Sequence, residues 1–209
     1  SSLDNLKHFI LIPVVNEPDL VLKDSLNSIL NQTYPTKSIT LVYTIEEKYH
    51  EDVERRINKL LEGERNKLDL VLMYVHPAGI VGEAVGVGGA NRTWGATHAV
   101  EDLNKMGKSI RNYIFSSLDA DHVINSQYLA RLTHLYLTSD RRDNKFYSTA
   151  VHLFNNNLWR VPVIMRIEAN AVTLGGLSDW ATAARDTKDT FSSYSASLQT
   201  LIDANYWDV

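Results

Sequence analysis

Two acidic side chains in the middle of the chain have the type and spacing to carry out chemistry. Asp119 and Asp121 lie one residue apart, directly after the β-forming run at 113–118. In an extended backbone, side chains two positions apart fall on the same side, so both carboxylates can reach one ligand. Hard divalent cations prefer oxygen ligands, and Mg²⁺ typically takes one or two protein carboxylates and leaves its other positions to water and phosphate. The pair therefore predicts a site for Mg²⁺ or Mn²⁺; the alternative is a solvated acidic turn.

The elements that must position this pair alternate between strands and helices. Apolar runs rich in β-branched residues predict four strands, at 7–15, 38–45, 68–75 and 110–118. Helical spacing of apolar residues predicts helices between them, at 18–34, from about 53 to 63, and at 92–106. Strands that alternate with helices in this way form a parallel sheet with helices on its faces. The pattern therefore predicts an α/β fold with a mostly parallel central sheet.

Polar or glycine-rich residues follow each of the four predicted strands. They are, in chain order, Asn16 with Glu17, Glu46 with Glu47, the glycine-rich segment 77–91, and Asp119 with Asp121. Ligands of such sheets bind outside the carboxyl ends of the strands. We therefore expect these residues to converge on one crevice.

The last third of the chain departs from the regular alternation. The patterns predict a helix at 125–138, an extended segment at 146–154, a helix from Pro162 to about Leu174, a polar, turn-rich segment at 186–195, and a short final helix at 197–205. We expect one domain over 1–209, because 209 residues with 44% hydrophobic content suffice for a single core.

Composition excludes several classes of function. A net charge of -4 and no basic stripe argue against a non-specific nucleic-acid binder. The chain has no cysteine, which excludes disulfides and Cys-ligated zinc. No apolar run reaches the roughly 18 residues of a membrane span, and no signal segment begins the chain. The chain starts at Ser1 without a Met, and we expect it to be a piece of a longer protein.

These motifs, taken in order, resemble the family 2 glycosyltransferases of the GT-A fold, including the processive cellulose-synthase-like members. Segment 12–17 (IPVVNE) looks like the opening strand and loop of the family, and segment 26–35 resembles the end of its first helix. Glu46 falls where the family has an acidic residue that holds the base or ribose. Segment 118–121 (LDAD) matches the Asp-x-Asp motif that binds the metal and the nucleotide-sugar. The match runs along almost the whole chain.

Two segments resemble the family less fully. Segment 86–91 (GVGGAN) is similar to a G-K-x-x-x-N segment near the diphosphate, but Val87 stands where a lysine is common, so Arg92 is the candidate for the basic contact. Segment 191–195 with Tyr206 and Trp207 resembles the stretch just before an acceptor-side Glu-Asp that includes the catalytic base. We therefore expect no catalytic residue within the chain and a base beyond Val209. Asp203 and Asp208 are expected at the surface.

The resemblance implies a Rossmann-like GT-A domain that carries out metal-dependent, inverting transfer of a sugar from a nucleotide-diphosphate sugar. Residues 1–124 would form the nucleotide-sugar-binding half and 125–209 a truncated acceptor-side half. The implied contacts to the nucleotide-sugar are Pro13, Asn16, Glu17, Glu46, Asn91, Arg92 and Asp119, and the implied metal ligands are Asp121 and Asp119.

The chemistry explains why a metal is expected. Negative charge builds up on the leaving diphosphate, and a bound cation stabilises that charge. We assign Asp121 to direct coordination of Mg²⁺ or Mn²⁺ and Asp119 to the ribose or a metal-bound water. His122 is expected to pack or hydrogen-bond, because imidazole is not a preferred ligand of Mg²⁺.

The implied partners are a UDP- or GDP-linked donor and a saccharide or lipid acceptor, with no nucleic acid. The implied location is the cytoplasm, as a domain of a membrane protein. Its association with the membrane would come only from segments outside this sequence. Two alternatives stay open: a domain that binds a nucleotide-sugar or a protein without catalysis, and a haloacid dehalogenase-type phosphatase with Asp119 as nucleophile. More than half the chain precedes Asp119, whereas such a motif normally opens its domain. A dinucleotide-binding dehydrogenase is disfavoured because Asn16, Glu17 and Pro18, not glycines, follow the first strand.

Overall fold

A computed structural model describes residues 5–83, 88–148, 158–182 and 193–207. The chain divides into two compact units, one formed by Ser1–Tyr147 with Ser195–Val209 and the other by Ser148–Tyr194. The expectation of one domain with halves at 1–124 and 125–209 stays a prediction.

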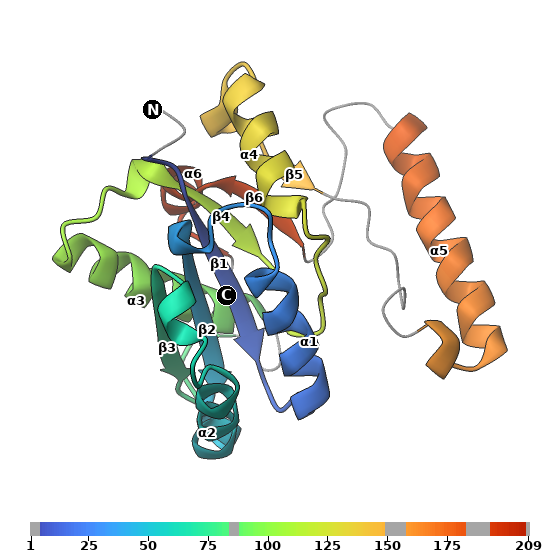
Figure 1. Cartoon of the computed structure of the whole chain (residues 1–209), viewed down its shortest axis with the longest axis horizontal. Coiled ribbons are helices and arrows are strands. Elements are labelled where there is room, and N and C mark those ends of the chain that lie inside the picture. Colours follow the sequence, from blue (N-terminus) through green and yellow to red (C-terminus); the bar gives the residue numbers. More distant parts are fainter. Residues whose placement is uncertain (1–4, 84–87, 149–157, 183–192, 208–209) are drawn as a thin grey trace. The chain divides into compact units, whose positions relative to one another are not determined.

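The first unit is built around a six-stranded sheet with the strand order β3-β2-β1-β4-β6-β5 (Figure 1). The strands are β1 (Lys7–Val14), β2 (Ile39–Glu46), β3 (Leu70–His76), β4 (Tyr113–Ser117), β5 (Tyr147–Ser148) and β6 (Tyr194–Ser197). β1 pairs in parallel with β2 and β4, and β2 pairs in parallel with β3. The predicted four-stranded parallel arrangement is therefore confirmed.

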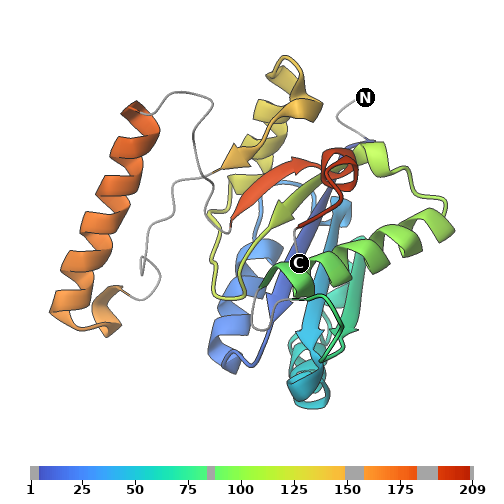
Figure 2. The same ribbon diagram turned by 180° about the vertical axis from the view of Figure 1, so that it is seen from behind.

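Helices cover both faces of this sheet (Figures 1 and 2). The helices of the first unit are α1 (Asp19–Leu30), α2 (His50–Leu60), α3 (Gly88–Lys105), α4 (Tyr128–Thr138) and α6 (Leu198–Asp203). Side chains alternate between the two faces of a strand. The hydrophobic core against α1 and α2 contains Ile10, Ile12, Leu41 and Tyr43, together with Leu22, Leu26, Val53 and Ile57 of the two helices. Helix α3 packs on the opposite face, against Leu11 and Thr44.

Helix α3 approaches that face unusually closely because of Gly95. A Cβ atom at Gly95 would lie 1.7 Å from Thr44 Oγ1 and 3.2 Å from Leu11 Cδ1. No side chain fits in that space, so only glycine allows the helix to lie at this distance from β1 and β2. This contact sets the position of the first turns of α3 relative to the carboxyl ends of the strands.

The structure corrects several predicted boundaries. Helix α3 begins at Gly88, one turn before the predicted start at Arg92, so Gly88, Gly89 and Asn91 are helical rather than part of a loop. The low helix propensity of glycine concealed this turn in the sequence. β4 begins at Tyr113, after a 3₁₀ turn at Ile110–Asn112. Residues 194–197, which the sequence placed at the end of a polar segment and the start of a helix, form β6, whose short run of serines and alanine gave no strand signal.

The second unit contains one long helix, α5 (Val163–Thr182), preceded by the 3₁₀ turn η7 (Leu158–Arg160). The predicted helix after Pro162 is confirmed, but it runs to Thr182 and not only to about Leu174. The Pro162 carbonyl accepts a hydrogen bond from Arg166 N over 3.2 Å. The Arg166 guanidinium lies 5.1 Å from the centre of the Trp159 ring. Of the predicted extended segment at 146–154, residues 147 and 148 form β5 and residues 149–154 lie outside the described residues, as do 186–192 and Asp208. Within the described ranges, no helix combines the length and the apolar character that a membrane span requires.

Candidate functional site

A cleft of about 580 Å³ lies at the carboxyl ends of the parallel strands. Its walls come from the ends of β1, β2, β3 and β4 and from the first turn of α3. The predicted site residues that line it are Pro13, Glu17, Glu46, Asn91, Arg92, Asp119 and Asp121. The expected convergence of the four strand ends on one crevice is therefore confirmed, except that Asn16 and Glu47 do not line it. The roles of these residues as ligand contacts stay predictions.

Asp119 and Asp121 lie in a tight turn just beyond β4. Leu118 N still donates to Leu11 O over 3.0 Å, which keeps the chain beside β1, and His122 N then donates to Asp119 O over 3.0 Å. Oxygens of the two carboxylates and one nitrogen of His122 all lie within 4.8 Å of one another. The Asp121 side chain is 71% exposed and the Asp119 side chain 32%. Asp121 is thus the carboxylate more open to a ligand.

His122 hydrogen-bonds to the backbone of this turn. Its Nδ1 accepts from Asp119 N over 3.1 Å, so the neutral ring carries its proton on Nε2. This Nε2 lies 3.6 Å from Asp119 Oδ2 and 3.9 Å from Asp121 Oδ1. In this tautomer Nε2 carries a proton and has no lone pair for a metal. The expectation that His122 hydrogen-bonds rather than ligates a cation stays a prediction.

Arg92 reaches from the first turn of α3 to the acidic turn. It donates from NH2 to Asp119 Oδ1 over 2.5 Å and from Nε to Ser117 Oγ over 3.1 Å. Its side chain is only 14% exposed. A Cβ atom at Gly88 would lie 2.5 Å from Arg92 NH1, so the glycine leaves the space in which the guanidinium lies. The sequence predicted Arg92 as a site residue but gave no sign of its pairing with Asp119.

A chain of polar contacts continues the site toward β3. Asn91 is 2% exposed and donates from Nδ2 to Glu46 Oε1 over 2.7 Å. Glu46 Oε2 lies 3.2 Å from His76 Nδ1, and His76 Nε2 lies 2.9 Å from Glu83 Oε2. The buried Asn91 Oδ1 has no hydrogen-bond partner among the residues that the structure describes. Asn91 Oδ1 can therefore accept a hydrogen bond from a bound ligand or from a residue outside the described ranges.

Sequence reasoning missed His76 and Glu83. His76 is the last residue of β3 and pairs in register with Glu46, the last residue of β2. The rule that ligands bind at strand ends, applied one residue beyond the predicted strand at 68–75, would have identified it. Glu83 lies outside any helix or strand, at the edge of the described residues, and no periodic pattern marks it.

The loop between β1 and α1 holds two predicted residues that the structure separates. Glu17 lines the cleft, and its Oε2 accepts from Val15 N over 2.9 Å. Asn16 does not line the cleft, and its Oδ1 accepts from Arg56 NH2 over 2.7 Å. Arg56 NH1 also donates to Glu17 O over 2.7 Å. Arg56 of α2, a residue that the sequence did not single out, therefore fixes this loop, and the contact predicted for Asn16 stays a prediction.

Buried hydroxyl groups support β4 from below. Ser116 Oγ lies 2.7 Å from Ser195 Oγ in β6, and Tyr128 OH of α4 lies 3.2 Å from the same atom. Burial raises the pKa of the Tyr128 phenol above its ordinary value, so the phenol stays protonated and can donate. This network ties β6 to the strand that carries the acidic turn.

The segment after α6 returns to the same region. Trp207 N lies 3.4 Å from Thr93 Oγ1, and the Trp207 ring lies 5.7 Å from the ring of Phe115 in β4. Thr93 follows Arg92 directly. The predicted acceptor-side residues Tyr206 and Trp207 are thus brought beside the first turns of α3.

The charge balance of the cleft is acidic. Its lining includes five carboxylates, those of Glu17, Glu46, Glu83, Asp119 and Asp121. Arg92 is the one arginine or lysine among the described residues that line it. A diphosphate alone would be repelled here, whereas a divalent cation would be attracted. The donor set of two neighbouring carboxylates fits Mg²⁺ or Mn²⁺.

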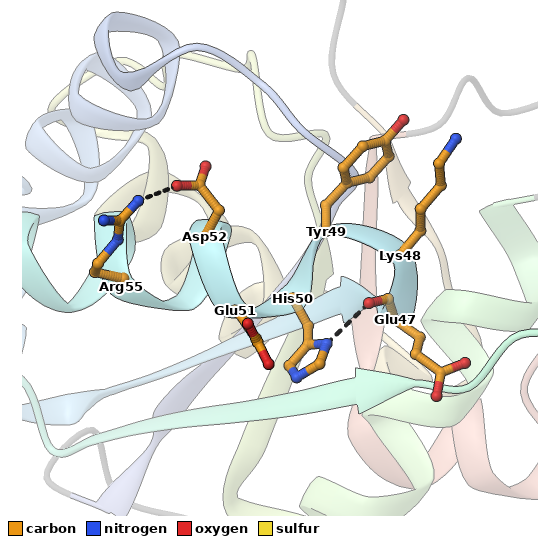
Figure 3. Close-up of a pocket in the computed structure, with 7 residues that line it drawn as sticks. All are labelled: Glu47, Lys48, Tyr49, His50, Glu51, Asp52 and Arg55. Atoms are coloured by element: carbon orange, nitrogen blue, oxygen red, sulfur yellow. Dashed lines mark hydrogen bonds and ion pairs between the residues drawn. The ribbon is translucent and has the colours of Figure 1, made fainter.

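A second hollow lies along the outside of α2 and the 3₁₀ turn η3 (Glu47–Tyr49) (Figure 3). The side chains that line it are Glu47, Lys48, Tyr49, His50, Glu51, Asp52 and Arg55. They come from one continuous segment and bond locally, since Arg55 donates to Asp52 and His50 Nδ1 lies 2.8 Å from Glu47 O. The hydrogen bond from Arg55 lowers the pKa of the Asp52 carboxyl. The hollow shares no lining residue with the cleft, and we do not regard it as the functional site.

The parallel order β3-β2-β1-β4, the helices on both faces and the acidic turn after β4 define an α/β domain of the GT-A type. The crystal structure of S. aureus TarS 1-349 in complex with UDP shares this fold, with a TM-score of 0.54, 14% identity, and coverage of 97% of this chain and 50% of that chain.

Two further solved structures match at lower TM-scores. The WbbM bifunctional glycosyltransferase matches at a TM-score of 0.49 with 12% identity, over 98% of this chain and 34% of that chain. The mannosyltransferase PcManGT from Pyrobaculum calidifontis in complex with GDP-Man and Mn²⁺ matches at 0.47 with 17% identity, over 73% of this chain and 38% of that chain. The fold assignment rests on the TarS structure. This chain spans half or less of the length of each of these three proteins. By sequence, no protein-family model and no curated protein matches the chain.

Proposed function

We propose that this chain is the donor-binding part of a family 2, cellulose-synthase-like glycosyltransferase. It would bind a nucleotide-diphosphate sugar with Mg²⁺ or Mn²⁺ and serve inverting transfer to a saccharide or lipid acceptor. The observation that carries this proposal is the position of Asp119 and Asp121, which share one cleft with Glu46, Asn91 and Arg92 in a GT-A fold. The GT-A fold gives no support to the phosphatase alternative.

The acidic turn would hold the cation. Asp121, the more exposed carboxylate, is the direct ligand, and Asp119 contacts the ribose or a metal-bound water. When bound, the metal supplies Lewis-acid stabilisation of the charge that builds up on the departing diphosphate. The acidic lining of the cleft supports metal dependence, because a diphosphate needs added positive charge to enter it.

The nucleoside would extend from this turn toward β2 and β3. The end of β2 lies two strand spacings from the end of β4, about 10 Å, because β1 lies between them. A donor whose diphosphate lies near Asp121 can therefore bring its nucleoside to Glu46 and Asn91. Asn91 Oδ1, which has no partner among the described residues, fits a hydroxyl or N–H donor of that nucleoside. The UDP in the TarS structure supports a nucleotide in this fold, and either UDP- or GDP-linked sugars fit the proposal.

The catalytic base of the inverting step would come from residues beyond Val209. Asp203 is not a good substitute, because it lies exposed in α6 and accepts from Gln199 Nε2 over 2.9 Å. The position of Trp207 beside Thr93 supports an acceptor-side segment that continues near the cleft. In the whole protein, such a domain would lie in the cytoplasm, and any membrane association would come from other segments.

Isothermal titration with UDP and GDP, each with and without Mn²⁺, tests this proposal. We expect binding of at least one nucleotide in the presence of Mn²⁺, and loss of that binding in an Asp121→Asn variant. Asp203→Asn is the matched control, since it removes an exposed carboxylate that lies outside the cleft lining. The proposal is wrong if neither nucleotide binds, or if Asp121→Asn binds both as the wild type does.

A donor-binding domain without catalysis is the second candidate, since binding of the metal and the nucleotide needs only the cleft residues named above. Release of free sugar from a bound UDP- or GDP-sugar separates the two candidates. Slow hydrolysis that depends on Mn²⁺ would indicate a transferase site, whereas tight binding without turnover would indicate a binding domain.

A further inference from the structure

We propose that Arg92 pairs with Asp119 before the metal binds, and that its guanidinium moves to the diphosphate when the metal and the donor bind. This inference rests on the proposed function, and it concerns how metal and donor binding are coupled at that site. Arg92 would be a positioning residue for the acidic turn in one state and a donor contact in the other.

The first support is the ion pair itself. Arg92 NH2 lies 2.5 Å from Asp119 Oδ1, and His122 Nε2 lies 3.6 Å from the other oxygen of the same carboxylate. Both oxygens of the Asp119 carboxylate therefore already face a nitrogen-bearing side chain, while Asp121 stays open to the cation. A metal or a metal-bound water that draws on Asp119 must compete with the guanidinium, because two positive groups beside one carboxylate repel each other.

The second support is the space that the fold provides for the guanidinium. A Cβ atom at Gly88 would lie 2.5 Å from Arg92 NH1, so the glycine at the start of α3 leaves room for this side chain. The guanidinium also spans from Ser117 Oγ at the end of β4 to Asp119 in the turn. Arg92 thus lies against the two residues that flank Leu118, at the point where the strand becomes the acidic turn.

The third support is the charge balance. Arg92 is the one arginine or lysine among the described lining residues, against five carboxylates. Without a metal, Arg92 places a positive charge on the acidic turn through its ion pair with Asp119. Once a divalent cation takes over that task, the guanidinium becomes available to a diphosphate, whose oxygens match its planar donors. No other arginine or lysine in the described lining can make this contact.

The proposal predicts effects of opposite sign on two ligands. Arg92→Gln removes the competitor of the cation, so the affinity for Mn²⁺ alone should rise about threefold to tenfold. The affinity for GDP or UDP at saturating Mn²⁺ should fall about tenfold to a hundredfold, because a charge-assisted contact is lost. An Arg92 with only a structural role would lower both affinities together.

The measurements are an electron paramagnetic resonance titration of free Mn²⁺ without nucleotide, and calorimetry with GDP and with UDP at saturating Mn²⁺. Lys105→Gln is the matched control, because it removes one positive charge from the same helix about 20 Å away, beyond the screening distance. It should leave both affinities unchanged. If Arg92→Gln does not fold, Gly88→Ala takes its place in the same Mn²⁺ titration. The added methyl displaces the flexible guanidinium and keeps the backbone contacts, so the affinity for Mn²⁺ should again rise.

The outcomes separate the two proposals. A wild-type protein that binds neither Mn²⁺ nor a nucleoside diphosphate would overturn the proposed function. A wild-type protein that binds both, with an unchanged or weaker affinity for Mn²⁺ in the decisive variant, would overturn only the role of Arg92. A higher affinity for Mn²⁺ with a lower affinity for the nucleotide in Arg92→Gln would establish the coupling.

Discussion

Asn91 and Glu46 join the first turn of α3 to the end of β2 through a hydrogen bond of 2.7 Å. The bond uses the Nδ2 group of a side chain that is 2% exposed and leaves its Oδ1 unpartnered among the described residues. An unpartnered buried acceptor costs free energy, which a ligand that donates to it can recover.

Asn91→Ala should therefore weaken nucleotide binding. The variant removes the free acceptor and also releases Glu46, so we expect the affinity for the better of UDP and GDP to fall about tenfold to a hundredfold. Calorimetry at saturating Mn²⁺ measures this. Asn104→Ala, an exposed position of the same helix, is the control. An unchanged nucleotide affinity in Asn91→Ala would show that Asn91 does not contact the nucleotide.

Gly95→Ala should destabilise the first unit. The added Cβ would lie 1.7 Å from Thr44 Oγ1, so α3 or β2 must move, and overpacking of this kind costs about 1–3 kcal/mol. The free energy of unfolding in urea measures the effect. Gly175→Ala in α5 is the control, because nothing lies within 4 Å of its added Cβ and alanine favours a helix. Equal stability of the wild type and Gly95→Ala would contradict the close approach of α3.

His8 should make the protein less stable as the pH falls. Desolvation lowers the pKa of this fully buried imidazole from 6.5 to about 3, and its Nε2 lies 2.8 Å from Thr133 Oγ1. The folded state thus holds His8 neutral, while the unfolded state binds a proton below pH 6.5. The stability that His8 contributes is complete above that pH and is lost progressively as the pH falls toward 3.

The measurement is the free energy of unfolding at pH 7.5 and pH 5. The wild type should lose about 2 kcal/mol more than His8→Gln over this range, since one proton contributes about 1.4 kcal/mol per pH unit below 6.5. His134→Gln, at an exposed position of α4, should keep the slope of the wild type. Identical slopes for the wild type and His8→Gln would show that His8 does not titrate in this way.

Arg56→Gln should loosen the loop between β1 and α1. Arg56 donates to Asn16 Oδ1 and to Glu17 O, and its side chain is 17% exposed. Loss of these charge-assisted bonds should lower the free energy of unfolding by about 1–3 kcal/mol and weaken nucleotide binding through Glu17. Arg55→Gln is the control, because its side chain is 76% exposed and pairs only with Asp52 in the described structure. Full nucleotide affinity in Arg56→Gln would show that the position of the loop does not depend on the hydrogen bonds from Arg56.

Local patterns in the sequence were sufficient for the framework of the first unit. The four apolar runs became β1 to β4 in parallel pairing, and the acidic pair came to lie at the end of β4. Burial imposes a period of two on a strand and of 3.6 on a helix, and both periods can be read from neighbouring residues. The rule that parallel strands end at one edge then placed Glu46 and Asp119 in the same cleft.

Other features depend on residues far apart in the chain, and no local pattern encodes them. The pairing of Arg92 with Asp119 requires α3 to lie close to the sheet, which the contact between Gly95 and Thr44 permits. The bond from Arg56 to Asn16 likewise depends on how α2 lies beside the first loop. The strands, their order along the chain and the acidic pair can be predicted from neighbouring residues, because they follow from local burial and backbone periodicity. Which charged groups pair in the cleft is known only from the packed fold, because that depends on distances between elements far apart in the chain.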